Sequence, residues 1–344
     1  MAIVTTDNIH YKNIADAMRE KTGKTDLLYP SEMADEVSEV YNEGLDRGRD
    51  LFRSIDDFYE FFAYKRRLNL LDQLRYDDTS NATNFSYMFA GDNTLTEIPY
   101  FDTSKGTDFS YMFRGCTNIK KLPEFDTSSA TRMNNMFYEC AALTAVPKSL
   151  YTGNCTELSY LFCQCQGLNS IPNLDTSKCT NFSYMFAYCY SLYDMPSIDT
   201  SKGTNFTQMF TSCKVVPEID TSSGTNFTSM FFMCKATTIP RLNVSNSTKS
   251  LEYLFESATN LETVNFEGVI KQKIGFKYNP NISKATIVHV IDKLSSEVSG
   301  QTCIFKLASI NKQFETSEGA SDGSTSSEWA SLVATKPNWT FSLV

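Results

Sequence analysis

The stretch TNFSYMFAYCYSLYDMPSIDTSKG, residues 180–203, is one copy of a unit that the chain repeats. Its opening heptapeptide, TNFSYMF, also stands letter for letter at residues 83–89, and with one change, as TDFSYMF, at residues 107–113. Self-similarity at a fixed period of tens of residues is the sequence signature of a repeat protein. This stretch therefore decides how the rest of the sequence is interpreted.

The last phenylalanine of each heptapeptide marks the period. The eight markers are Phe89, Phe113, Phe137, Phe162, Phe186, Phe210, Phe231 and Phe255. The steps between them are 24, 24, 25, 24, 24, 21 and 24 residues. Eight units therefore run from about Asp78 to about Val269.

The unit divides into two parts by its periodicity. Apolar residues lie at i, i+3, i+4, i+7 and i+10, which predicts a short α- or 3₁₀-helix: Phe182, Met185, Phe186, Cys189 and Leu192. The proline that follows favours an extended segment, and the Asp-Thr-Ser after it predicts a turn that caps the next helix. A unit of this size buries its apolar face only against neighbouring units.

The pattern MFxxCxxLxxIPxhDTS, with h apolar, resembles the BspA-like leucine-rich repeats of bacterial surface and adhesion proteins. The resemblance implies an α/β solenoid, a leucine-rich-repeat-like stack of about eight 24-residue units. Three units depart from the pattern: one is shortened around Lys214, one has Leu150-Tyr151-Thr152 in place of Asp-Thr-Ser, and one has Ala258 in place of cysteine.

The N-terminal segment has a different character. Residues 9–21 and 31–51 are predicted to form two helices. The phrase IADAMREKTGKTDLLYPSEMADEVSEVYNEGLDRGRD, residues 14–50, resembles the N-terminal segment of tail- and baseplate-associated proteins from phages of Gram-positive gut bacteria. That resemblance implies a virion protein at the tail tip or baseplate, with other tail or baseplate proteins as partners and a homo-oligomer, expected to be a trimer.

The predicted domain organisation has four parts. Residues 1–52 are the helical attachment segment, 53–76 a helical neck or N-terminal cap, 77–270 the solenoid and 271–344 a C-terminal α+β cap. In the last part we expect helices at 284–294 and 328–335, strands at 302–307 and 339–344, and a loop at 317–327. This part resembles the cap that follows such repeats, and the alternative is a separate ligand-binding head.

Composition limits the class of function. The chain of 344 residues has a net charge of −9, with 21% charged and 41% hydrophobic residues, which fits a soluble folded protein. Clustered Lys and Arg are needed to neutralise phosphates, so nucleic-acid binding is disfavoured. The apolar stretches are shorter than the roughly 20 residues of a membrane span, and the N-terminus does not match a secretory signal.

Ten cysteines are present, but their spacing does not indicate disulfide pairs. Six of them each follow a marker phenylalanine by three residues: Cys116, Cys140, Cys165, Cys189, Cys213 and Cys234. A repeat position of this kind predicts reduced cysteines packed in the core, and no zinc-type Cys/His spacing is present.

Catalytic and metal-binding residues are not indicated either. The two histidines, His10 and His289, lie in different predicted domains without a matched nucleophile and acid. The Asp of each Asp-Thr-Ser would form a row of carboxylates, but each has a task in its turn, and Asn243 replaces one of them. We therefore expect no enzyme, no cofactor and no metal.

The remaining candidates are surface positions. Units differ most from one another at two positions that flank the proline, and freedom to vary marks solvent-facing sites on an extended binding face. These candidate ligand-facing residues are Glu97, Tyr100, Lys121, Glu124, Lys148, Asn173, Asp194, Glu218 and Arg241. A second candidate row precedes the methionine: Tyr87, Tyr111, Tyr160, Tyr184 and Tyr253. These tyrosines either stack on a sugar or anchor a partner, or they pack repeat against repeat.

The expected function is recognition of a host cell-surface glycan or protein by a non-catalytic phage virion protein. The first alternative is a bacterial BspA-like adhesin on the cell surface, which would have to be exported. The second alternative is a structural tail or decoration protein whose repeats serve as a spacer. The sequence does not indicate which solenoid face binds.

Overall fold

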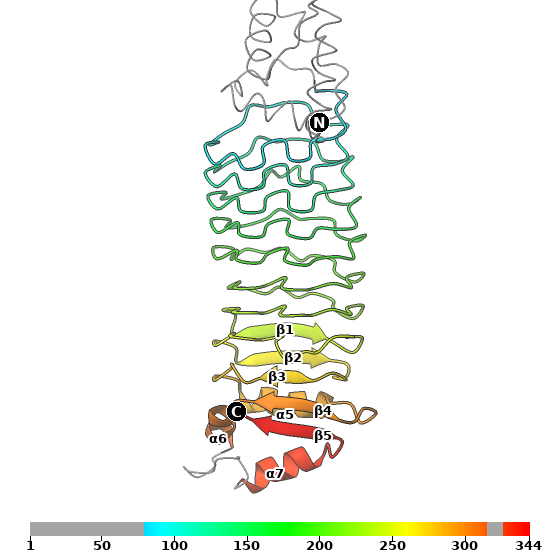
Figure 1. Ribbon diagram of the computed structural model, residues 1–344, viewed down its shortest axis with the longest axis vertical. Coiled ribbons are helices and arrows are strands. Elements are labelled where there is room, and N and C mark those ends of the chain that lie inside the picture. Colours follow the sequence, from blue (N-terminus) through cyan, green and yellow to red (C-terminus); the bar gives the residue numbers. More distant parts are fainter. Residues whose placement is uncertain (1–78, 315–325) are drawn as a thin grey trace, which may run out of the picture.

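The computed structural model describes residues 79–314 and 326–344, where the chain winds into coils that lie one on the next along a single axis (Figure 1). Neighbouring coils are joined by hydrogen bonds between residues 24 positions apart, such as Thr131 N–H to the Thr107 carbonyl at 2.8 Å. We name each coil by its order, so that the first contains Phe89 and the eighth Phe255. The predicted attachment segment and the neck lie outside the described residues.

The heptapeptide of each coil forms a succession of turns, so the predicted short helix is wrong. In the fifth coil the Met185, Ala187 and Cys189 N–H groups each donate to the carbonyl three residues earlier, at 3.1–3.2 Å. The alternate Tyr184 and Phe186 N–H groups donate to the sixth coil instead, at 2.8 and 3.1 Å. A helix directs every N–H along its own axis, whereas here half of them are used to join coils.

Each heptapeptide also places residues in the left-handed region of backbone space. Tyr184 has φ of 59° and Tyr188 φ of 63°, and Gly91 and Gly115 stand where Tyr188 does in the first two coils. This conformation costs a non-glycine residue about 1–2 kcal/mol. The packing of neighbouring coils therefore fixes a backbone that the isolated unit does not favour.

The proline-containing segment of the seventh coil is extended, as predicted. It is the strand β1 (Thr238–Asn243), which pairs in parallel with β2 (Thr263–Glu267), the corresponding segment of the eighth coil, which has no proline. Their register shifts between Ile239 and Leu242. Pro240 lies in this gap and has no N–H to donate, which accounts for the interruption.

Stacked phenylalanine rings run through the centre of the coils. Each marker ring packs on the next with centroids 5.3–6.0 Å apart and interplanar angles of 2–15°. All eight marker rings are fully buried. Such stacked pairs add about 0.5–1.5 kcal/mol each beyond the burial of their area, so the heptapeptide supplies the core.

Two further ladders join the coils at their edges. In the Asp-Thr-Ser turn the buried Thr176 hydroxyl donates to the Asp199 carbonyl of the next coil at 2.6 Å, and the Asp199 carboxylate accepts the Ser201 N–H at 3.0 Å. The repeat cysteines donate their thiols to the preceding coil, as Cys189 does to the Phe162 carbonyl at 3.1 Å. All ten cysteines are free and buried, as the sequence predicted.

The chain after the eighth coil continues the stack. Its elements, in order, are β3 (Ile274–Phe276), α5 (Lys284–Lys293), β4 (Gln301–Phe305), α6 (Leu307–Gln313), α7 (Ser327–Ala334) and β5 (Trp339–Leu343). The strands form a parallel sheet in the order β3-β4-β5. The structure thus has both predicted helices and both predicted strands, and adds β3 and α6; most of the predicted loop lies outside the described residues.

The phenylalanine ladder extends into this sheet and ends there. Phe255 stacks on Phe276 at 5.2 Å, and Phe276 stacks on Phe305 at 5.5 Å. The buried Trp329 of α7 then meets Phe305 edge-on, at 6.0 Å and 88°. Because the Trp329 ring lies edge-on, it covers the last ring face of the ladder and presents no parallel face on which another ring could stack. The helix α7 therefore terminates the stack.

Candidate functional site

The nine candidate residues that flank the prolines are all exposed. Several nevertheless contact the neighbouring coil. The Glu124 carboxylate accepts the Ser149 hydroxyl at 2.5 Å and its N–H at 3.0 Å, and these bonds lower the pKa of Glu124. The Arg241 guanidinium donates to the Glu267 carboxylate at 2.8 Å. The structure therefore places this row on the surface, where two members also bridge coils.

The tyrosine row packs coil against coil. Tyr87 stacks on Tyr111 with centroids 4.5 Å apart, and Tyr160 stacks on Tyr184 at 4.3 Å. Each of these four rings lies face to face with its partner, which covers one face of the ring. The geometry favours the packing interpretation for these pairs, while Tyr253 lies apart from them and is 44% exposed.

The row is interrupted at the third coil, where Asn135 replaces tyrosine. The Arg114 guanidinium lies 5.8 Å from the centroid of Tyr111 and 5.5 Å from that of Tyr138. Tyr138 in turn meets Tyr160 edge-on at 6.0 Å. Burial raises the pKa of the Tyr160 phenol to about 12, so this ring remains a neutral hydrogen-bonding group near neutral pH.

The seam between the third and fourth coils is open at one edge. In the second, third, fifth, sixth and seventh heptapeptides, the first threonine donates its N–H and its hydroxyl to the carbonyl of the same threonine in the preceding coil, as Thr204 does to Thr180 at 2.9 and 3.2 Å. Neither bond joins Thr156 to Thr131 among the described residues. The step between Phe137 and Phe162, which crosses this seam, is 25 residues.

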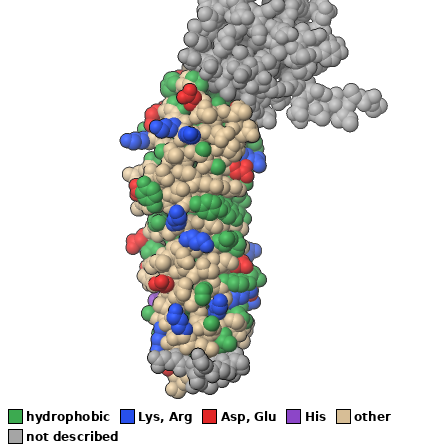
Figure 2. Space-filling view, turned by 90° about the vertical axis from the view of Figure 1, so that its left-hand side faces the viewer, with side chains coloured by type: hydrophobic (Ala, Val, Ile, Leu, Met, Phe, Trp, Pro, Cys, Tyr) green, Lys and Arg blue, Asp and Glu red, His purple; other side chains and the backbone are tan. Residues whose placement is uncertain are grey.

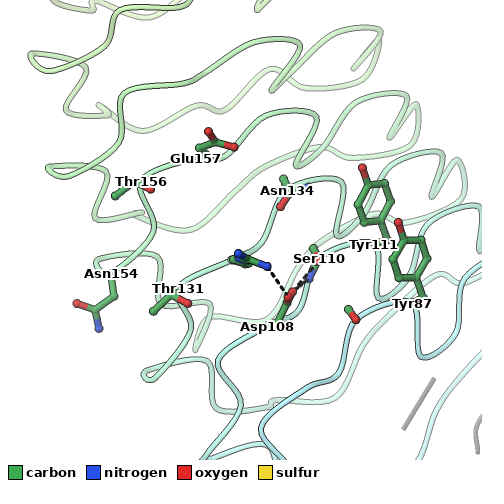
Figure 3. Close-up of a pocket in the computed structure, with 11 residues that line it drawn as sticks. Tyr87, Asp108, Ser110, Tyr111, Thr131, Asn134, Asn154, Thr156 and Glu157 are labelled. Atoms are coloured by element: carbon green, nitrogen blue, oxygen red, sulfur yellow. Dashed lines mark hydrogen bonds and ion pairs between the residues drawn. The ribbon is translucent and has the colours of Figure 1, made fainter. Parts of the chain in front are cut away.

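A polar groove of about 710 Å³ spans this seam (Figure 3). Its lining comes from the first four coils: Ser86, Tyr87, Asp108, Ser110, Tyr111, Thr131, Arg132, Asn134, Asn154, Thr156 and Glu157. Figure 3 shows the two tyrosine rings at one side and Asn154, Thr156 and Glu157 at the other. Of the candidate residues predicted from sequence, only Tyr87 and Tyr111 line it.

Asp108 organises the middle of the groove. Its Oδ1 accepts the Ser110 N–H at 2.9 Å and the Ser110 hydroxyl at 2.6 Å. Its Oδ2 lies 3.5 Å from an Arg132 nitrogen. The Arg132 side chain is 72% exposed, so its guanidinium retains donors that face solvent. The Glu157 side chain, across the seam, is also exposed.

Sequence reasoning missed Arg132 and Glu157, although a signal was present. Most other units have Asn or Asp at this heptapeptide position, whereas the third heptapeptide reads TRMNNMF and the fourth TELSYLF. The Asn or Asp side chain usually closes a local turn, as Asn205 does by accepting the Thr207 N–H at 3.2 Å. Arg132 has no oxygen to close such a turn, so its side chain is available to the groove.

The described part of the chain holds no cluster of three or more His, Cys, Asp or Glu residues suited to a metal ion. His289 contacts the Phe266 carbonyl through Nε2 at 2.9 Å, and His10 lies outside the described residues. Within those same residues no helix is long and apolar enough to cross a membrane. On the face in Figure 2, charged side chains of both signs are interspersed with small hydrophobic groups.

The chain was compared with protein-family models and with curated proteins. No curated protein matches the sequence. The family model described as "Mycoplasma protein of unknown function, DUF285" matches residues 56–170, 116–219 and 199–282, which together span 56–282 and so cover more than half of the chain. Overlapping matches of this kind are expected when a family model meets a repeated unit. The chain therefore belongs to the DUF285 family.

Proposed function

We propose that this protein is a non-catalytic attachment protein of a tailed phage, which recognises a host cell-surface glycan or protein. The observation that carries the proposal is that the buried positions of the repeat are nearly the same in all units, whereas the exposed positions beside the proline differ from unit to unit. In this proposal the stack acts as a leucine-rich-repeat-like solenoid. Stacked coils give the variable positions a rigid and extended support, which is how repeat proteins present binding faces.

The location in the virion rests on the resemblance of residues 14–50 to tail and baseplate proteins. In this proposal residues 1–52 bind other tail or baseplate proteins, residues 77–270 contact the host, residues 271–344 cap the stack, and the assembly is a homo-oligomer, expected to be a trimer. No cofactor, metal or nucleic acid takes part.

Adsorption tests the proposal directly. Phage particles that carry the protein without residues 76–270 should assemble and should no longer adsorb to host cells. Assembly is followed by electron microscopy and adsorption by the fraction of particles left free after mixing with cells. Unchanged adsorption by assembled particles would leave the repeats as a spacer, which is the structural alternative.

A bacterial surface adhesin of the BspA-like kind is the second candidate, and the resemblance of the repeat pattern MFxxCxxLxxIPxhDTS to such proteins supports it. The two candidates differ in gene neighbourhood. Tape-measure and baseplate genes beside this gene support the phage protein, whereas their absence together with export machinery for this protein supports the adhesin.

A further inference from the structure

We propose that the groove at the open seam between the third and fourth coils binds a neutral or N-acetylated carbohydrate. This inference rests on the proposed recognition function and assigns its ligand class and its site. It differs from the sequence expectation, because the groove residues Arg132 and Glu157 were not among the residues predicted from sequence.

The open seam exposes backbone groups that, at the neighbouring seams, are hydrogen-bonded between the threonines of adjacent coils. In the described structure the Thr131 carbonyl accepts no hydrogen bond, and the Thr156 N–H and hydroxyl donate none. Both residues line the groove. Backbone groups held by flanking coils lose little conformational freedom on binding, which favours affinity.

The side chains of the lining fit a ligand with many hydroxyl groups. They are hydroxyls, amides, carboxylates, one guanidinium and two tyrosines, and no aliphatic side chain takes part. A peptide binds chiefly through apolar or aromatic anchors, and the two aromatic rings of this lining are stacked on each other. A carbohydrate instead exchanges hydrogen bonds with such groups through adjacent hydroxyls, each of which both donates and accepts.

Asp108 and Arg132 are arranged for this exchange. Ser110 holds one oxygen of Asp108 through two hydrogen bonds, which fixes the carboxylate. The 3.5 Å ion pair places the Arg132 donors beside the second oxygen. A pair of vicinal hydroxyls can donate to the carboxylate and accept from the guanidinium at the same time. Tyr87 and Tyr111 stack on each other and together form one wall of the groove.

Charge narrows the carbohydrate class. Two carboxylates and one guanidinium line the groove, so it has one net negative charge. The chain as a whole has a net charge of −9. Both disfavour sialylated or sulfated sugars, because desolvated like charges repel. Neutral hexoses and N-acetylhexosamines match the lining without that penalty.

The test uses the full chain on a printed array of neutral, N-acetylated, sialylated and sulfated oligosaccharides. The groove variant is the double substitution Arg132→Asn and Glu157→Asn, which installs the residue that the fifth, sixth and seventh heptapeptides have at this position. The matched control is Lys284→Ala, which removes an exposed lysine from its ion pair with Glu328, outside both the groove and the candidate ligand-facing row. Circular dichroism and thermal unfolding check that both variants fold as the parent does.

We expect the parent and Lys284→Ala to retain one series of neutral or N-acetylated glycans. The groove variant should bind that series at least about tenfold more weakly, which is the scale of losing one or two hydrogen bonds to a charged group. Retention of no such glycan, preference for anionic glycans, or equal binding by a folded groove variant would overturn the proposal.

Host-cell adsorption by the same proteins separates the groove assignment from the proposed function. If cells are bound equally by parent and groove variant, recognition stands and the groove assignment fails. If instead the groove variant loses glycan binding but the parent does not bind host cells, the groove assignment is supported and the proposed function is contradicted.

Discussion

Two neighbouring seams of the stack differ at the surface and agree in the core. Between the fourth and fifth coils, the Thr180 N–H donates to Thr156 and the tyrosine rings stack at 4.3 Å. Between the third and fourth coils the described structure has neither the threonine bonds nor a face-to-face tyrosine pair, and Tyr138 meets Tyr160 edge-on. Phe137 and Phe162 still stack there at 5.7 Å. The buried ladder therefore holds the coils together while the surface edge opens, which lets a rigid repeat contain an irregular site.

The largest expected effect is the loss of a ladder ring. Phe186→Ala removes a buried ring that stacks at 5.9 Å on both Phe162 and Phe210. Such a substitution costs about 3–5 kcal/mol of unfolding free energy, from lost burial and the cavity left behind. Urea denaturation followed by circular dichroism measures it. Tyr193→Ala, at a 68% exposed position, should change stability by less than about 0.5 kcal/mol. Equal effects would mean that the ladder does not hold the seams.

The next effect concerns the tight seam between the eighth coil and β3. A Cβ at Gly275 would lie 2.4 Å from the Glu252 carbonyl oxygen, a backbone atom that cannot turn aside. Gly275→Ala should therefore cost about 1–3 kcal/mol, read as a lower urea midpoint. In Gly91→Ala the new methyl group meets nothing within 4 Å, and only the φ of 76° opposes it, so we expect a loss of about 1 kcal/mol. An unchanged urea midpoint for Gly275→Ala would show that the backbone at this seam shifts to make room for the methyl group.

Matched threonine substitutions compare the closed and open seams. Thr204→Val removes the hydroxyl that donates to the Thr180 carbonyl at 3.2 Å and should cost about 0.5–1 kcal/mol. Thr156→Val removes a hydroxyl without such a bond at the open seam and should cost less. Thermal unfolding of the two variants side by side measures the difference. If Thr156→Val costs as much as Thr204→Val, the seam is closed in solution.

The smallest effect is a dependence on acid that comes from the Asp-Thr-Ser turns of the fourth and fifth coils. Hydrogen bonds from Ser177 and Ser201 lower the pKa of Asp175 and Asp199, respectively. A carboxylate with a lowered pKa in the folded state stabilises the fold above its ordinary value near about 4, and this contribution disappears as pH falls through the folded value. The unfolding temperature should therefore decrease as pH falls from about 4 to about 2. Asp199→Asn, which imitates Asn243, should keep the turn and lessen that decrease; an unchanged decrease would assign it to other groups.

Much of the buried interior was predictable from sequence. The heptapeptide phenylalanines and methionines and the repeat cysteines are buried as predicted, because an apolar letter kept in nearly every unit has few roles besides packing. The elements after the eighth coil were also largely predicted, since α5 and α7 show helical periodicity and have serine caps. The ladder's extension to Phe276 and Phe305 was missed, because neither residue lies in a heptapeptide.

The sequence by itself determined the period, the buried letters and the positions that vary, since these follow from comparing units with one another. Only the tertiary structure decided that the heptapeptide is a chain of turns, because the i, i+3, i+4 spacing is the same whether N–H groups point along the chain or to the next coil. The tertiary structure also decided that Asp108, Arg132 and Glu157 share a groove. Residues about 24 positions apart meet only once the coils stack.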